Sequence, residues 1–344
     1  MNFAQRIAPL IKILPGKVVQ LNISSKFPTD IIKLLDQYNN PFDTMVLTNG
    51  DVWRYFDSRD LIFNHPKLKH KKVFIHNCGY DNIKFSENNY EIAFPLFYFG
   101  RFYVLNKTKS NSFIPLIKNL NYGFSCLNHR ASIDRILLGY NLNKKNLLDD
   151  MVYSQHTYGN WWQTNSLPIN SDIPYDLQSY LDLLPIVHNT EEHLLGKMQK
   201  QLPYGGSQLD TIDHPAYIDA YCNIVTESEC EEWPYCRNIN LPIITEKTNK
   251  PFITKQIPLF LAARGHLKYL KGLGFEVMED LLPSGYDEMP ALQKINSIVN
   301  LVSKGKEFIQ DYYFSHLKEI QHNYELVNSD KVEQVILQRI KDFL

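Results

Sequence analysis

Short apolar runs alternate with polar turns and helical patterns along this chain, and this alternation constrains its fold more than any other feature. In the first third, four runs have the length and composition of buried strands, at 18–23, 44–47, 72–75 and 92–96. Between the first two, 29–38 has helical spacing, with Thr29 or Asp30 as its cap. Strands and helices alternating at this spacing predict an α/β layer.

The same rhythm returns after the polar segment 106–111. We expect strands at 122–127, 151–154 and 258–263, helices at 131–139 and 266–273, an α/β continuation at 215–226 and 242–245, and two or three helices in 289–344. A chain of 344 residues exceeds what one hydrophobic core usually supports. The sequence therefore predicts an N-terminal α/β domain at 1–112 and a C-terminal α/β domain with terminal helices at 113–344.

Composition narrows the function classes. The net charge is −1, so no global basic field holds nucleic acid. Five cysteines are scattered without a Cys-x-x-Cys pair, which predicts free thiols in a reducing compartment. No run has the roughly 18 to 20 apolar residues of a membrane span, and the first 15 residues lack a signal-peptide pattern. We expect no membrane span and a cytoplasmic location.

Three groups of polar residues follow predicted strands, where open α/β sheets bind ligands. Arg130 and Arg135 follow the strand at 122–127, and guanidinium groups suit phosphate; the alternative is arginines on a solvated helix. Glu227 follows 215–226 and could hold ribose hydroxyls, or it could cap a helix.

The third group is Thr245, Glu246, Lys247 and Lys250, between an apolar run and the strand at 258–263. If a helix starts at Thr245, its free N–H groups and positive end face an anion such as a diphosphate, with both lysines beside it. The alternative is that Thr245 only caps the helix.

Several absences exclude reaction classes. The chain has no P-loop, no Gly-x-Gly-x-x-Gly and no Gly-x-Ser-x-Gly, which argues against P-loop enzymes, typical dinucleotide dehydrogenases and serine hydrolases. It also has no His-Glu-x-x-His and no Asp-x-Asp. His65, His70 and His76 form a loose cluster without paired carboxylates, so no metal site is predicted.

The motifs resemble a group of bacterial and viral glycosyltransferases. The resemblance rests on motifs in the group's order, namely Cys126-Leu-Asn-His-Arg130 with Arg135, 147–149, 151–154, Asn223-Ile-Val-Thr-Glu227, Ile244-Thr-Glu-Lys247 with Pro251, 265–270, 273–275 and 285–287. It covers 124–287. The Thr-Glu-Lys block is also similar to the donor-binding region of fucosyltransferases, which share the two-domain GT-B architecture.

The resemblance implies a GT-B-like α/β fold with two Rossmann-like domains facing a central cleft and a helical C-terminus. It implies that 113–344 binds a UDP- or GDP-linked sugar as co-substrate, with no other cofactor. Lys247 and one of Arg130 or Arg135 would contact the diphosphate, and Glu227 or Glu246 the ribose or sugar hydroxyls. Asn249 stands where the group usually has phenylalanine, and Ile257-Pro-Leu replaces Pro-Phe. The resemblance therefore does not imply which sugar is transferred.

In GT-B enzymes the N-terminal half usually holds the acceptor and the catalytic base, which takes the proton of the attacking hydroxyl. Asp81, after a predicted strand and a glycine turn, is our candidate, and Asp51 has the same logic; either could be a turn residue. We expect an inverting, metal-independent glycosyltransferase whose acceptor is hydroxymethylated pyrimidine in phage DNA or a cell-surface glycan. The alternative is a non-catalytic interaction protein on the same fold.

Overall fold

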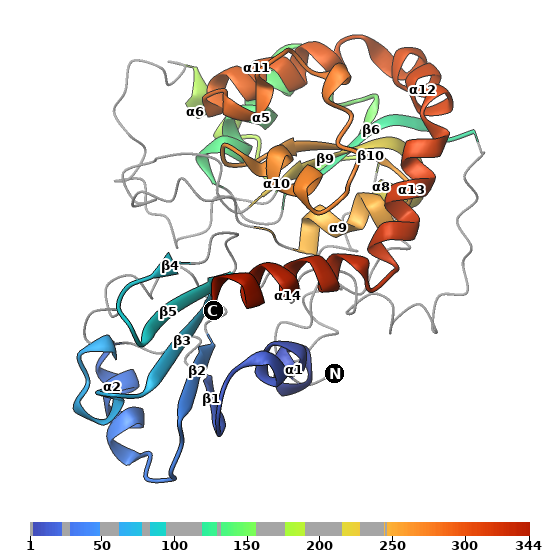
Figure 1. Ribbon diagram of the computed structural model, residues 1–344. Coiled ribbons are helices and arrows are strands. Elements are labelled where there is room, and N and C mark those ends of the chain that lie inside the picture. Colours follow the sequence, from blue (N-terminus) through green and yellow to red (C-terminus); the bar gives the residue numbers. More distant parts are fainter. Residues whose placement is uncertain are drawn as a thin grey trace. The chain divides into compact units, whose positions relative to one another are not determined.

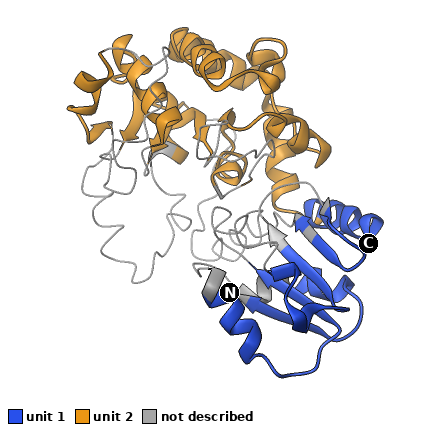
Figure 2. Ribbon diagram, turned by 90° about the vertical axis from the view of Figure 1, so that its left-hand side faces the viewer, with its two compact units in different colours: residues 1–102, 331–344 blue, residues 103–330 orange. Residues whose placement is uncertain are grey.

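In a computed structural model of the protein, the described residues are 3–22, 28–48, 62–77, 83–93, 119–128, 132–155, 176–189, 215–227, 244 and 246–344. The chain divides into two compact units, 1–102 with 331–344, and 103–330 (Figure 2). The sequence had placed the boundary after 112 and had grouped every terminal helix with the second domain. The last helix instead belongs to the first unit.

The first unit is built around a largely parallel sheet (Figure 1). Its elements are α1 (Phe3–Ile13), β1 (Val18–Asn22), α2 (Pro28–Gln37), β2 (Thr44–Thr48), η2 (Pro66–Leu68), β3 (Lys72–Asn77), β4 (Ile83–Lys84), β5 (Asn89–Ala93) and α14 (Lys331–Phe343). The described strands run in the order β1-β2-β3-β5-β4, and only β4 is antiparallel. The first three predicted strands and the predicted helix are confirmed, whereas β5 lies three residues before its predicted start.

Helix α14 joins the first unit through its apolar face. Val332, Ile336 and Ile340 are buried at a spacing of four residues, which places them on one side of the helix. The helix packs on α1, and the ring of Phe343 meets that of Tyr90 on β5 edge-on at 6.0 Å. The sequence predicted that 289–344 is largely helical, but not that the last helix completes the core of the first unit.

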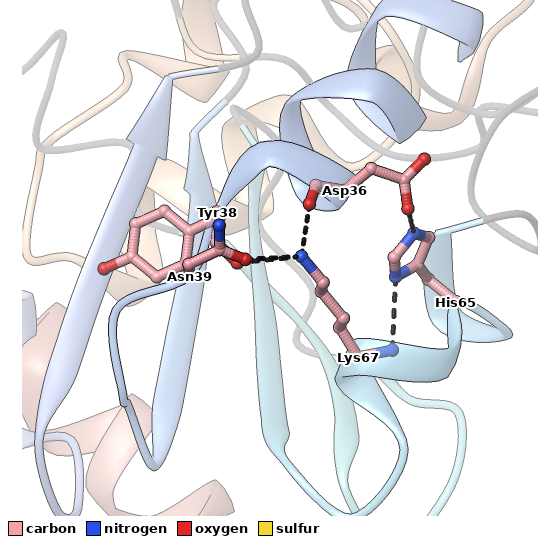
Figure 3. Close-up of polar contacts among 5 residues, drawn as sticks. All are labelled: Asp36, Tyr38, Asn39, His65 and Lys67. Atoms are coloured by element: carbon pink, nitrogen blue, oxygen red, sulfur yellow. Dashed lines mark hydrogen bonds and ion pairs between the residues drawn. The ribbon is translucent and has the colours of Figure 1, made fainter.

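A lysine closes the end of α2 (Figure 3). Lys67 Nζ donates to the carbonyl oxygens of Asp36 and Tyr38, the latter at 3.0 Å, and to Asn39 Oδ1 at 3.2 Å. A cation at these terminal carbonyls satisfies acceptors that the helix leaves open. His65 is buried beside it, with Nε2 3.2 Å from Asp36 Oδ1 and Nδ1 accepting from Lys67 N–H. Nδ1 of His65 therefore caps η2, and Nε2 links η2 to α2.

The second unit holds another largely parallel sheet. Its elements are β6 (Tyr122–Asn128), α5 (Ile133–Lys144), β7 (Met151–Gln155), α6 (Leu177–Leu181), β8 (Ile186–His188), α8 (Pro215–Ile218), β9 (Ala220–Thr226), α9 (Glu246–Ile253), β10 (Ile257–Leu261), α10 (His266–Gly272), η6 (Glu279–Leu281), η7 (Tyr286–Glu288), α11 (Ala291–Val302), α12 (Gly305–Ser315) and α13 (Leu317–Val327). The described strands run in the order β10-β9-β6-β7-β8, and only β8 is antiparallel.

Helices cover both faces of this sheet. Figure 1 shows α5 and α11, which pack on each other, on one side of the strands and α9 on the other. Strands β7, β9 and β10 are buried at every residue, as expected for parallel strands between two helical layers. The α/β class is therefore confirmed. The C-terminal segment holds four helices, α11 to α14, where two or three were expected.

Gly139 of α5 lets this helix approach a buried polar cluster at the end of β7. Tyr153 and Tyr180 both place their hydroxyls on Gln155 Oε1, at 2.6 and 3.2 Å. A Cβ at Gly139 would lie 2.1 Å from Tyr180 Oη and 2.2 Å from Tyr153 Oη, far inside van der Waals contact. The helix can therefore pack here only because it lacks a side chain at this position.

Gly139→Ala should lower the free energy of unfolding by about 2 kcal/mol, because the clash outweighs the roughly 1 kcal/mol gained in helix propensity. Urea denaturation measures this difference. Gly272→Ala is the matched control, at the exposed last residue of α10, and should leave stability unchanged or slightly higher. Equal stability of Gly139→Ala and the wild type would contradict the packing described.

Candidate functional site

The strand order of the second unit reverses between β6 and β9. From β6 the chain crosses through α5 to β7 on one side, and it later returns to pair β9 with the other side of β6. Open parallel sheets bind ligands outside the carboxyl ends of the strands at such a switch point. The described parallel strands of the first unit follow chain order without a reversal. Topology therefore directs the search to the β6–β9 edge.

Polar side chains collect at the carboxyl ends of the central strands. Thr226 Oγ1 donates to Asn128 Oδ1 at 2.6 Å, which ties the end of β9 to the end of β6. Gln155 stands opposite Asn128 at the end of β7. All three side chains are buried although the strands behind them are mostly apolar. Buried polar groups need hydrogen-bond partners, so this edge is a network rather than a continuation of the core.

Arg135 is buried in the first turn of α5 and reaches across to β9. Its Nη2 donates to the carbonyl oxygens of Thr226 at 3.0 Å and Glu227 at 3.2 Å. The sequence placed this arginine on a ligand diphosphate or on a solvated helix surface. The structure brings it to the same edge as Glu227, where its guanidinium fixes the end of β9.

Glu227 is held from three elements. Its N–H donates to Leu261 O of β10 at 3.0 Å, its carbonyl accepts from Arg135, and its carboxylate Oε1 accepts from Thr248 Oγ1 of α9 at 2.5 Å. A carboxylate at the first turn of a helix is stabilised by the positive helix end. The helix that Glu227 would cap in the alternative interpretation follows it in the chain, outside the described residues; the contact with Thr248 places the acid at the switch point.

The lysines of α9 have different surroundings. Lys247 lies in the first turn and is partly exposed. Lys250 is buried, and its Nζ donates to Tyr217 Oη at 3.1 Å and lies 4.9 Å from the centre of that ring. Tyr217 precedes β9, so this contact lies at the amino end of the strand, opposite Glu227. Lys250 therefore contacts α8, whereas Lys247 lies in the turn of α9 that is nearest the carboxyl ends of the strands.

Four sequence candidates fall outside what is described. Asp81, Arg130 and Thr245 are outside the described residues, and so is the alternative base Asp51. Glu246 begins α9, as expected for a helix starting at this point, but its side chain is not among those described. Pro251 lies inside this helix.

Sequence analysis missed the partner of Glu227. Thr248 directly follows Lys247 but had no predicted role, because its contact depends on how α9 packs against β9. The place of Gln155 at this edge and the burial of Asn249 were not predicted from sequence either. Gln155 Nε2 and both amide atoms of Asn249 are buried without a hydrogen-bond partner among the described residues. A polar residue directly after an apolar strand was the available signal for Gln155.

The buried cysteines of the central strands are not nucleophiles. Cys126 on β6 and Cys222 on β9 are free thiols in the part of the chain described. Burial raises the pKa of the Cys126 thiol to about 12 and raises that of Cys222 well above its ordinary value. Thiolate chemistry needs a lowered pKa, so both residues serve packing.

His266 is a buried imidazole beside the carboxyl end of β10. Its ring lies 4.8 Å from that of Phe260, and neither nitrogen has a hydrogen-bond partner among the described residues. Burial lowers its pKa to about 3; Asp287 opposes this shift and Lys294 adds to it. Lys294 Nζ donates nearby to Ala262 O at 2.9 Å. The imidazole is therefore neutral throughout the physiological pH range.

This lowered pKa makes stability depend on pH. In the unfolded chain His266 takes up a proton below about pH 6.5, whereas the folded protein resists it until about pH 3, so its contribution is lost as pH falls between these values. Between pH 7 and pH 5 the loss is about 2 kcal/mol. His266→Leu should remove that part of the acid sensitivity, measured by urea denaturation at both values. Identical pH dependence in the variant would contradict the buried neutral imidazole.

Comparisons with known proteins add no relative. The chain has no significant match among protein-family models, curated proteins or solved structures. Among the described residues no helix is long and apolar enough to cross a membrane, and no group of three His, Cys, Asp or Glu side chains is placed to hold a metal. The geometry of the β6–β9 edge and the sequence pattern are thus what supports a functional assignment.

Proposed function

We propose that the second unit binds a nucleoside diphosphate sugar and that the protein transfers the sugar to a hydroxyl acceptor. The observation that carries this proposal is the switch point between β6 and β9, where a carboxylate, a hydroxyl and an amide meet at the carboxyl ends of parallel strands. Nucleotides bind open parallel sheets at such places. The order of the motifs around this edge, which resembles that of glycosyltransferases, supports the same proposal.

In this proposal the charge of each residue determines which part of the ligand it contacts. Glu227 accepts hydrogen bonds only, so it suits the hydroxyls of ribose or sugar and repels phosphate. Lys247, with Arg130 and Thr245, would face the diphosphate at the start of α9. Arg135 would not touch the ligand, and would instead hold the end of β9 in place. The sugar is not assigned.

The GT-B arrangement is part of the same proposal. Two α/β units with largely parallel sheets are compatible with it. The first unit would then hold the acceptor, with Asp81 as the base that takes the proton of the attacking hydroxyl. Cations and a helix end would stabilise the departing diphosphate, in an inverting reaction without a metal.

A second candidate is a non-catalytic interaction protein on a transferase-like fold. Arg135 and Lys250, both assigned to the diphosphate from sequence, are buried in contacts with the protein itself. Their presence in the chain therefore no longer argues for catalysis. Nucleotide binding separates the two candidates, since only the enzyme requires it.

Lys247→Ala should weaken binding of UDP or GDP by about tenfold, because one cation contact to phosphate is lost. Isothermal titration with a panel of nucleotides measures the affinity. Lys268→Ala is the matched control, since Lys268 is an exposed lysine on α10. It should bind as the wild type does. No nucleotide binding by the wild type would overturn the enzyme proposal, and an unaffected Lys247→Ala would remove this lysine from the site.

The acceptor is tested by salt dependence. Because the net charge is −1, we expect weak binding to duplex DNA with little response to salt, which favours the glycan acceptor. A logarithmic slope of about −0.9 per phosphate contacted would instead favour DNA. Mass spectrometry after incubation with donor sugars, hydroxymethylated DNA and oligosaccharides identifies the product. Sugar found only on DNA would contradict the glycan expectation.

A further inference from the structure

Thr248 makes one contact that its helix does not require. A threonine within a helix can bond back to a carbonyl one turn earlier. Here Oγ1 donates to Glu227 Oε1 at 2.5 Å, across 21 residues of chain, and the side chain is fully buried. A hydroxyl given to a carboxylate at this distance is a charge-assisted bond, stronger than one between neutral groups.

The contact links two elements at the switch point. Glu227 is the first residue after β9, with its backbone already fixed by Leu261 and Arg135. Those two bonds determine where the chain leaves the sheet, and they do not orient the carboxylate. Thr248 holds the carboxylate itself, and it lies one residue after Lys247 on the same turn of α9.

We propose that Thr248 is a positioning residue that aims the Glu227 carboxylate at a vicinal diol of the ligand, the ribose of the nucleotide. The inference rests on the proposed function and deepens it. A carboxylate has several lone pairs, so it can accept the Thr248 hydroxyl and still accept donors from a ligand. A ribose offers two adjacent hydroxyl donors to such an acid.

Burial makes this arrangement selective. Glu227 is 3% exposed, so each hydrogen bond to it is strengthened by the low local dielectric. A site built to bind a hydroxyl discriminates strongly against an analogue that lacks it, because a buried polar group is then left unpaired. The ligand test is therefore a comparison of ribonucleotides with 2′-deoxyribonucleotides.

The decisive variants are Thr248→Val, which keeps the shape and removes the hydroxyl, and Thr248→Ser, which keeps the hydroxyl. Affinities for UDP, GDP and their 2′-deoxy forms are measured by titration calorimetry. We expect the wild type to bind the ribonucleotide about tenfold or more tightly than the 2′-deoxyribonucleotide. This preference should fall to about twofold in Thr248→Val and stay close to the wild-type value in Thr248→Ser. Rescue by serine distinguishes positioning from a packing role.

A double-mutant cycle with Glu227→Gln tests the contact without any ligand. The two substitutions should be coupled about fivefold in the unfolding equilibrium constant. An absent coupling overturns the inference, as does an unchanged ribose preference in Thr248→Val. Equal binding of ribo and deoxy forms by the wild type overturns it while leaving the proposed function intact. Failure of the wild type to bind any nucleotide removes the proposed function and this inference with it.

Discussion

The hydrogen bonds from Arg135 to the carbonyls of Thr226 and Glu227 are the constraint on which the candidate site depends. They join the first turn of α5, which follows β6, to the end of β9 across the line where the strand order reverses. A guanidinium is always charged and planar, so it can hold two acceptors in a fixed geometry. With the strand end fixed in this way, the Glu227 carboxylate has a defined starting point, and α9 can meet it through Thr248.

A buried cation is expensive unless protein groups pair with it, which explains why two cations that donate hydrogen bonds to the protein itself are poor ligand candidates. Arg135 and Lys250 have hydrogen-bond partners inside the protein, and releasing either for a phosphate would leave those partners unpaired. Lys247 is partly exposed and belongs to the first turn of α9. Burial therefore separates the two cations held inside the protein from the partly exposed Lys247, a distinction that residue type alone does not make.

Most parallel strands of both sheets could be predicted from sequence because parallel strands covered on both faces are continuous apolar runs, whereas the short antiparallel strands β4 and β8 were not predicted. Helix α9 was harder to predict, since Pro251 and the five polar residues before it disfavour a helix, and burial of the segment overrides that local preference. The role of Arg135 could not be predicted at all. Its partners lie 91 and 92 residues away, and only the pairing of β6 with β9 brings them into reach.

Three buried polar side chains near the carboxyl ends of the strands have atoms without hydrogen-bond partners among the described residues. Gln155 ends β7, His266 follows β10, and Asn249 lies in the half of α9 nearest Glu227; each has buried side-chain atoms without a partner in the part of the chain described. Leaving such a group unpaired costs about 1 to 3 kcal/mol, and apolar residues of similar size would avoid that penalty. A fold selected for stability alone would place apolar side chains there. All three lie toward the carboxyl ends of the parallel strands, whose interiors are mostly apolar, so stability alone does not explain these residue types.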